Sequence, residues 1–415
     1  MAGDAVPVEP AAPGVVISAA VMTHPRRQAE AARLAEALGG WHTRLALDPR
    51  PDGPPTTLRT AWAAWAAIRP GATHHLVLQD DVELCRDFTE RVESAAREHP
   101  DTPLAFYANW DSWNGAATRA AALGGARWVP AVPGEWVPTL ALLLPRRDVE
   151  ALLSATHPDH AEPEPDDVAL ARVLRARGRR VLISVPHLVE HTGQPSLVGN
   201  DRYGPRHSAC FADDVHDRAG APPGAPPGER ERDRDRDRPA DSGPARLPEV
   251  LVHRLRGRAH IVLTGPDPLE DEPRFISLRA YLDETGMTGR GLAHWEKARR
   301  DLQAPDSMLR LCEELWYCAY LLGAHTGSGH MVPPPRLVRV ALRSLVLGGT
   351  ALPAEQRLWT ERHAARLTTL AEHGFAAGLD DHRTYGPPRP VPAERRAALP
   401  PAERIWQDPR LADAA

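Results

Sequence analysis

The stretch of residues 213–244 constrains the fold more than any other feature of this sequence. It reads DDVHDRAGAPPGAPPGERERDRDRDRPADSGP, in which Pro and Gly are followed by alternating Arg and acid. Because such a segment cannot bury apolar surface, we predict a disordered linker. The alternating charges largely cancel, which favours a solvated linker over a nucleic-acid-binding tail. The sequence therefore predicts two folded units, residues 1–212 and residues 245–415.

The composition argues against several classes of protein. Hydrophobic residues make up 42% of the 415 residues and charged residues 25%, enough for each unit to bury a core. The formal net charge of -5 argues against a nucleic-acid binder. Since no run of about 18 apolar residues occurs, we predict no transmembrane segment, and any membrane contact would be peripheral.

The cysteines and the first residues bear on the compartment. The four cysteines include no C-x-x-C pair, which favours a reducing environment. The first twenty residues lack the basic and long apolar parts of a secretory signal, so we expect a cytoplasmic protein. Lys297 is the only lysine and every other basic residue apart from histidine is Arg. We interpret this as the coding bias of a GC-rich bacterial genome.

Residues 1–212 alternate between strand-like and helix-like segments. Strands are predicted over residues 15–21, 43–47, 75–78, 104–107, 139–144 and 181–185, and helices over 26–38, 58–68, 88–98, 147–154 and 167–177. This alternation predicts an α/β domain with a mostly parallel sheet flanked by helices.

Residues 245–415 have a different pattern. Helices are predicted over residues 302–322, 337–347 and 354–372, with one or two strands within 250–263. We therefore expect a mainly helical accessory unit, in which no catalytic set of residues is recognisable.

The segment LVLQDDVELC, residues 76–85, is the strongest indication of a functional site. A buried strand runs directly into Asp80 and Asp81, and ligands of open α/β sheets bind at the carboxyl ends of strands. Adjacent carboxylates repel each other unless a cation lies between them or one is protonated. Mg²⁺ and Mn²⁺ take carboxylate oxygens and leave positions for substrate phosphates. The alternative is that one of the two acids caps the helix expected from residue 88.

Two further motifs carry candidate residues. Asp166 and Asp167 stand where a helix is predicted to start, so they either cap that helix or present a general base at its end. His191 follows a strand and precedes a glycine turn, where a neutral imidazole is able to complete a metal site. A single histidine there is equally compatible with a surface or capping role.

Together these motifs resemble those of GT-A-type nucleotide-sugar glycosyltransferases, especially lipopolysaccharide-type and family-2-like members. The resemblance covers residues 14–212 and rests on the opening strand VVISAAVMTHPRR, the strand-end LVLQDDV, the late Asp pair before a helix, and the closing H-T-G-x-x-S. It implies a GT-A-like fold and the transfer of a sugar from a nucleotide-sugar donor to a carbohydrate or other hydroxyl acceptor.

The resemblance also implies roles for particular residues. Asp81 and His191 would bind Mn²⁺ or Mg²⁺, and Asp80 the ribose or a metal-bound water. Thr23, His24 and Arg26 would contact the nucleotide, although Arg26 is equally well explained as a solvated helix charge. Asp166 or Asp167 would be the catalytic base of an inverting enzyme.

Gln79 stands where the family usually has an acid. This departure motivates a first alternative, a catalytically degenerate GT-A-like protein that only binds a ligand or partner. A second alternative is a metal-dependent nucleotidyltransferase or phosphohydrolase, because these enzymes also use strand-end aspartates.

Overall fold

The computed structural model describes residues 14–156, 164–197, 199, 201, 204–216, 245–255, 258–265, 271–326, 333–349 and 354–404. Helix α7 (Ala212–His216) occupies the first residues of the predicted linker. The remainder of that linker, residues 217–244, lies outside the described residues.

A seven-stranded sheet forms the N-terminal half, with the strand order β2-β1-β3-β7-β5-β8-β6. Strand β1 is parallel to β2 and β3, and β5 is parallel to β8, whereas β7 and β6 run antiparallel to their neighbours. The predicted α/β class with a mostly parallel sheet is therefore confirmed. The strands are β1 (Ile17–Thr23), β2 (Thr43–Leu47), β3 (His74–Gln79), β5 (Leu104–Ala105), β6 (Trp128–Pro130), β7 (Ala141–Pro145) and β8 (Leu182–Ser184).

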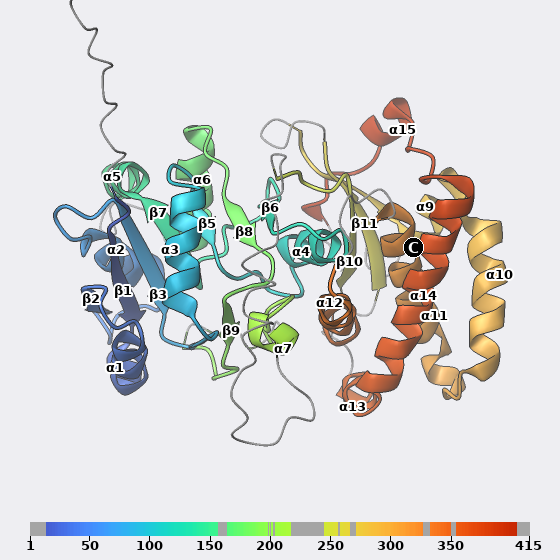
Figure 1. The fold of residues 1–415 in the computed structure, drawn as a ribbon, viewed down its shortest axis with the longest axis horizontal. Coiled ribbons are helices and arrows are strands. Elements are labelled where there is room, and N and C mark those ends of the chain that lie inside the picture. The colour runs from blue at the N-terminus through green and yellow to red at the C-terminus, as the bar shows by residue number, and fades with distance from the viewer. Residues whose placement is uncertain are drawn as a thin grey trace, which may run out of the picture.

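Helices cover both faces of this sheet (Figure 1). Because side chains alternate along a strand, Val21 of β1 joins one hydrophobic cluster and Met22 joins the other. Helices α1 (Gln28–Ala37) and α3 (Phe88–Glu98) supply Leu34 and Phe88 to the cluster that contains Val21. Helices α2 (Leu58–Ala66), α5 (Arg146–Ala155) and α6 (Asp166–Ala176) supply Trp65, Leu152 and Leu170 to the other cluster.

A two-stranded ribbon extends from the end of β3. Strand β4 (Val82–Leu84) pairs antiparallel with β9 (Val189–His191), in the register Val82 to His191. The sequence pattern predicted neither strand, because each has only three residues. The pairing sets His191 beside the end of β3, where the two strand-end aspartates lie.

The C-terminal half is largely helical, as predicted, and also contains a three-stranded antiparallel sheet. Residues 250–263 form two strands, β10 (Val250–Leu255) and β11 (Arg258–Leu263), and β12 (Arg274–Ser277) adds a third. The single helix predicted over residues 354–372 is two helices, α13 and α14. The helices are α9 (Leu278–Glu284), α10 (Thr288–Ala298), α11 (Asp306–Thr326), α12 (Pro335–Leu347), α13 (Ala354–Arg362), α14 (Ala364–Tyr385) and α15 (Ala393–Ala397).

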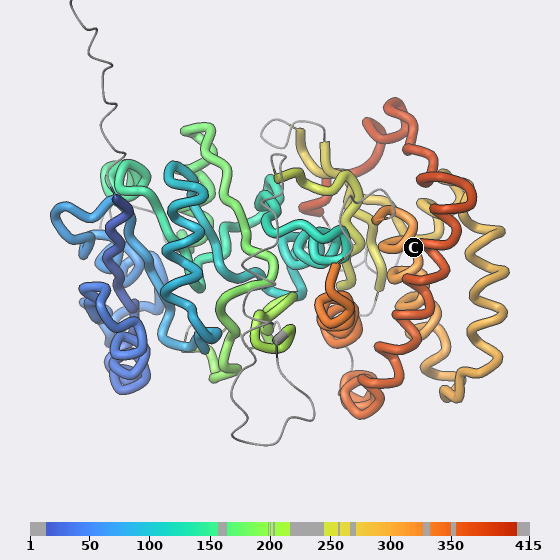
Figure 2. The backbone as a smooth tube through the Cα atoms, in the orientation of Figure 1, coloured from blue at the N-terminus to red at the C-terminus, as the bar shows by residue number. Residues whose placement is uncertain are grey.

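Helix α4 (Trp113–Leu123) lies between the two halves. Figure 2 follows the chain from the seven-stranded sheet on the left, through α4 near the middle, to the C-terminal helices on the right. Helix α4 contacts β6 on one side and β10, α11 and α12 on the other. One hydrophobic cluster accordingly includes Trp113 of α4 together with Leu251 and Trp316. In the described part of the chain, no helix combines the length and the apolar character that crossing a bilayer requires.

Candidate functional site

A cavity of about 1260 Å³ opens at the carboxyl ends of β1 and β3. Parallel strands end at the same edge of a sheet, so residues that follow different strands meet there. The segments after β1 and β3, the start of α6 and the end of β9 all line this cavity. All eight residues proposed for the site from the sequence are among its lining residues: Thr23, His24, Arg26, Asp80, Asp81, Asp166, Asp167 and His191.

The two strand-end aspartates share one cation, the guanidinium of Arg27. Its Nη1 atom lies 3.1 Å from Oδ1 of Asp80 and 3.2 Å from Oδ2 of Asp81. The Arg27 side chain is only 11% exposed, and its Nη2 atom donates to the carbonyl oxygen of Pro195. The repulsion between the two carboxylates, expected from the sequence, is therefore relieved by a side chain of the protein.

Asp80 contacts two partners, Arg27 and Thr23 at the end of β1. The hydroxyl of Thr23 donates a hydrogen bond of 2.6 Å to Oδ2 of Asp80. Burial raises the pKa of Asp80, as does the charge of Asp81, while Thr23 and Arg27 oppose the rise. Because the Thr23 hydroxyl is held by Asp80, it supports that carboxylate and is not left free for a nucleotide.

The predicted nucleotide contacts His24 and Arg26 shape the turn after β1. The Nδ1 atom of His24 accepts a hydrogen bond of 3.1 Å from the backbone N–H of Arg26, which caps the short helix Pro25–Arg27. The Arg26 side chain is exposed and has no hydrogen bond or ion pair within the described parts of the chain. Of the two residues, Arg26 therefore has the side chain that is available to a ligand.

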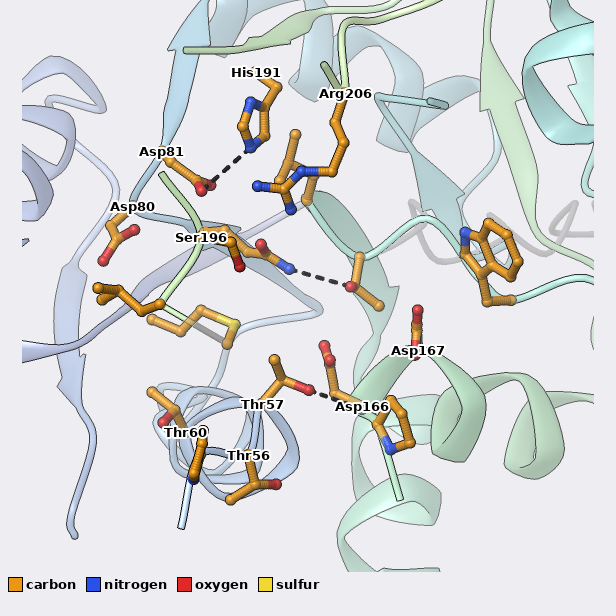
Figure 3. A pocket seen from close by; sticks show the side chains of 18 of the residues that line it. Thr56, Thr57, Thr60, Asp80, Asp81, Asp166, Asp167, His191, Ser196 and Arg206 are labelled. Atoms are coloured by element: carbon orange, nitrogen blue, oxygen red, sulfur yellow. Dashed lines mark hydrogen bonds and ion pairs between the residues drawn. The ribbon is translucent and has the colours of Figure 1, made fainter. Parts of the chain in front are cut away.

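His191 is the second residue that contacts Asp81 Oδ2, after Arg27. Its Nε2 atom lies 3.3 Å from Oδ2 of Asp81, and both side chains are buried (Figure 3). Its Nδ1 atom accepts a hydrogen bond from the backbone N–H of Gly193 at 2.9 Å, so the proton of the neutral ring is on Nε2. Burial acts to raise the pKa of Asp81, but His191, Arg27 and Arg206 outweigh it and lower that pKa.

The protein groups around Asp81 do not fit a divalent cation as they are arranged. Among the residues that the structure describes, no three carboxylate, imidazole or thiol groups converge well enough to hold a metal ion. Arg27 and His191 both approach Oδ2 of Asp81. The other oxygen of Asp81, the buried Oδ1, has no hydrogen-bond partner in the described chain. His191 presents an N–H group to this point instead of a lone pair. The need for Mn²⁺ or Mg²⁺ therefore stays a prediction from the sequence.

Asp166 and Asp167 begin helix α6 and differ sharply from each other. Asp166 is buried, and its backbone N–H donates a hydrogen bond of 3.2 Å to the hydroxyl oxygen of Thr57. Burial raises the pKa of its carboxyl group, while the hydroxyls of Thr57 and Thr139 oppose the rise. The amide of Gln79 donates to the Thr139 hydroxyl at 3.3 Å, which ties the end of β3 to this network. Asp166 thus joins the N-terminus of α6 to the residue that precedes α2, through its backbone.

The Asp167 side chain points into the cavity in Figure 3. Burial raises its pKa to about 7, and the charge of Asp166 adds to the rise, while the backbone N–H of Val168 opposes it. A carboxylate with a pKa near neutrality is well matched to take up a proton at physiological pH. Of the pair, Asp167 is the residue suited to a general base.

Arg27, Arg206 and Asp111 also line the cavity, and the sequence pattern predicts a site role for none of them. Arg27 belongs to the THPRR motif, but nothing local indicates that it turns back onto Asp80 and Asp81. Arg206 lies beyond β9 in a segment without periodicity, and it projects toward Asp81 and Ser196 in Figure 3. Asp111, whose pKa burial raises to about 6, accepts a hydrogen bond from the backbone N–H of Gly349.

The C-terminal half contributes to the cavity wall through Leu255 and Gly349. Comparisons with known proteins add no identity: no protein-family model matches the chain, and no curated protein matches it.

Proposed function

We propose that this chain is a GT-A-type glycosyltransferase, which transfers a sugar from a nucleotide-sugar donor to a hydroxyl acceptor. The observation that carries the proposal is the convergence of the strand-end Asp80–Asp81 pair, the helix-start Asp167 and His191 in one cavity. These residues come from segments far apart in the chain, and their order is that of the glycosyltransferase resemblance. The strand order β2-β1-β3, followed by an antiparallel β7, is compatible with the proposed fold.

The cavity has room and chemistry for both substrates. Its volume of about 1260 Å³ exceeds the roughly 300–1,000 Å³ of ordinary small-molecule sites. The exposed guanidinium of Arg26 lies at the end of β1, where the nucleotide is proposed to bind. Asp80 and Asp166 are proposed to be positioning residues, Asp80 through its contact with Arg27 and Asp166 at the start of α6.

In the proposed reaction, Asp167 accepts the proton of the acceptor hydroxyl. The acceptor oxygen forms a bond to the anomeric carbon as the bond from that carbon to the diphosphate oxygen breaks. The electron pair of the broken bond stays on the nucleoside diphosphate, which leaves. Direct attack inverts the anomeric centre, and general-base catalysis of this kind contributes about 10²- to 10⁴-fold.

The second candidate is a degenerate GT-A-like protein that binds its ligand without turnover. Its support is that Gln79 replaces an acid and bonds to Thr139, while Arg27 occupies both strand-end carboxylates. A nucleotidyltransferase or phosphohydrolase is less well supported, because these enzymes need a metal ion. Within the described residues, no three His, Cys, Asp or Glu side chains are arranged to hold one.

The test is a panel of nucleotide sugars incubated with the protein, with release of nucleoside diphosphate as the readout. Asp167→Asn is compared with Asp380→Asn, whose exposed carboxylate lies on α14 away from the cavity. We expect wild type and Asp380→Asn to turn over one donor, and Asp167→Asn to be at least about 10²-fold slower. Binding without turnover would support the degenerate protein, and no response to any nucleotide would rule out the proposal.

A further inference from the structure

Four arginines line the cavity, and they differ in what holds them. Arg59 is fixed by Asp48, with its Nε and Nη2 atoms 2.7 and 2.8 Å from the two carboxylate oxygens. Arg27 is fixed by the strand-end aspartates. Arg26 and Arg206 have no ion pair or side-chain hydrogen bond to any residue that the structure describes.

Of these two arginines, Arg206 is the one whose charge acts on the strand-end Asp81. Its guanidinium projects into the cavity beside the Asp81–His191 pair and points toward Ser196 (Figure 3). Its electrostatic effect reaches Asp81, since it contributes to lowering the pKa of that carboxylate. Its main chain is anchored, because the hydroxyl of the buried Tyr107 donates to the Arg206 carbonyl oxygen. The main chain of Arg206 is thus held in place, and its guanidinium donates no hydrogen bond to any residue that the structure describes.

Arg27 occupies the place where a divalent metal ion would bind the strand-end aspartates. Its charge lies within 3.2 Å of one oxygen of each strand-end aspartate, at the point where the resemblance places a divalent ion. A dication that coordinated both carboxylates there would lie within a few ångströms of the guanidinium, whose repulsion opposes the attraction of the carboxylates. At Asp81, Arg27 and His191 already approach Oδ2, which leaves Oδ1 as the oxygen without a partner in the described chain.

We propose that Arg206 binds a diphosphate in this cavity, and that Arg27 stands in for the divalent cation, so that diphosphate binding needs no metal. This inference rests on the proposed function for the identity of the diphosphate as a leaving group. A guanidinium carries five N–H donors in a planar fork that matches phosphate oxygens. Arg206 supplies that fork, while Arg27 lowers the repulsion between the two aspartates and the incoming anion.

Binding of inorganic pyrophosphate, measured by calorimetry in EDTA and again in Mn²⁺, tests the proposal. The variant is Arg206→Gln, and its control is Arg383→Gln, which removes the same charge from a side chain that is 70% exposed on α14. We expect wild type and Arg383→Gln to bind pyrophosphate with the same affinity. We expect each of them to bind it as tightly in EDTA as in Mn²⁺. We expect Arg206→Gln to bind about 10- to 100-fold more weakly, the range for a lost hydrogen bond to a charged group. Binding that EDTA abolishes, or that Arg206→Gln leaves unchanged, would overturn the inference.

A further variant and a further assay complete the test. Arg206→Lys retains the charge but not the fork, so we expect intermediate affinity, and circular dichroism checks that each variant is folded. Sugar transfer is then followed in EDTA with the donor that the nucleotide-sugar panel identifies. Turnover that requires Mn²⁺ would refute this inference and leave the proposed function intact. Pyrophosphate binding in EDTA without turnover of any nucleotide sugar would refute the function and support the role of Arg206.

Discussion

The carboxylate of Glu135 accepts a hydrogen bond of 2.6 Å from the backbone N–H of Asn114, in the first turn of α4. Its other oxygen accepts from the backbone N–H of Trp113 at 2.8 Å. The Asn114 side chain in turn accepts from the N–H of Val132 and donates to the carbonyl oxygen of Trp136. Glu135 therefore fastens the loop that carries Trp136, a cavity-lining residue, to the start of the helix that joins the two halves.

The stability of the protein is expected to fall as pH rises, in part through Glu135. Burial raises the pKa of Glu135 from 4.5 to about 8, although its two backbone hydrogen bonds lower it. Between these values the folded chain holds a proton that the unfolded chain has lost. The free energy of unfolding therefore decreases with pH, by up to about 1.4 kcal/mol per pH unit from this group.

Urea unfolding at several pH values between 5 and 9 checks this expectation. Glu135→Gln should show a smaller decrease in stability over that range, because it has no proton to lose. Glu150→Gln, whose side chain is 61% exposed on α5, should keep the wild-type slope. An identical slope in Glu135→Gln and wild type would contradict the assigned pKa.

The rate of sugar transfer should depend on the ionisation of Asp167. Because a general base acts in its ionised form, kcat/KM should rise with pH and level off above about 7, the pKa of Asp167. Asp111 also lines the cavity and has a pKa of about 6. The midpoint should therefore stay near 7 in Asp111→Asn if Asp167 is the base, whereas a midpoint that disappears in this variant would assign the profile to Asp111.

Replacing His191 should disturb Asp81. In His191→Phe, the carboxylate loses the N–H group at 3.3 Å and the N–H of Gly193 loses its acceptor. The pKa of Asp81 should rise, and the free energy of unfolding at pH 7 should fall by about 1–3 kcal/mol. Carboxyl-carbon NMR titration and urea unfolding measure the two effects. His42→Phe, at an exposed position, should change neither, and a His191→Phe protein with wild-type values would remove His191 from this role.

The contact between α11 and α14 should not tolerate a methyl group at Gly378. A Cβ atom there would lie 2.0 Å from the carbonyl oxygen of Tyr320 and 2.7 Å from the backbone nitrogen of Ala324. Since both are backbone atoms, the helices would have to separate, and Gly378→Ala should lose about 1–3 kcal/mol of stability or more. Gly289→Ala, on α10 with no atom within 4 Å of the new Cβ, should be neutral or stabilising by up to about 1 kcal/mol. Equal melting temperatures for the two variants would contradict this packing.

Much of the fold is readable from local pattern. Strand β2 and helix α3 have the bounds that their sequences predict, and β1, β3 and α2 differ by a few residues. Periodicity is informative for such elements because each buries a regular set of side chains against one layer. The short strands β4 and β9 and helix α4 escaped prediction, since three residues show no period and α4 is buried nearly all round.

The sequence by itself determined that the strand-end and helix-start aspartates lie at one edge of the sheet, because such positions of an α/β sheet converge there. Only the tertiary structure decided their partners. The turn after β1 brings Arg27 onto Asp80 and Asp81, and the pairing of β4 with β9 brings His191 onto Asp81. The chain beyond β9 places Arg206 in the cavity with no ion pair to a described residue. Charge pairing depends on distances of a few ångströms between segments far apart in the chain, which no local pattern encodes.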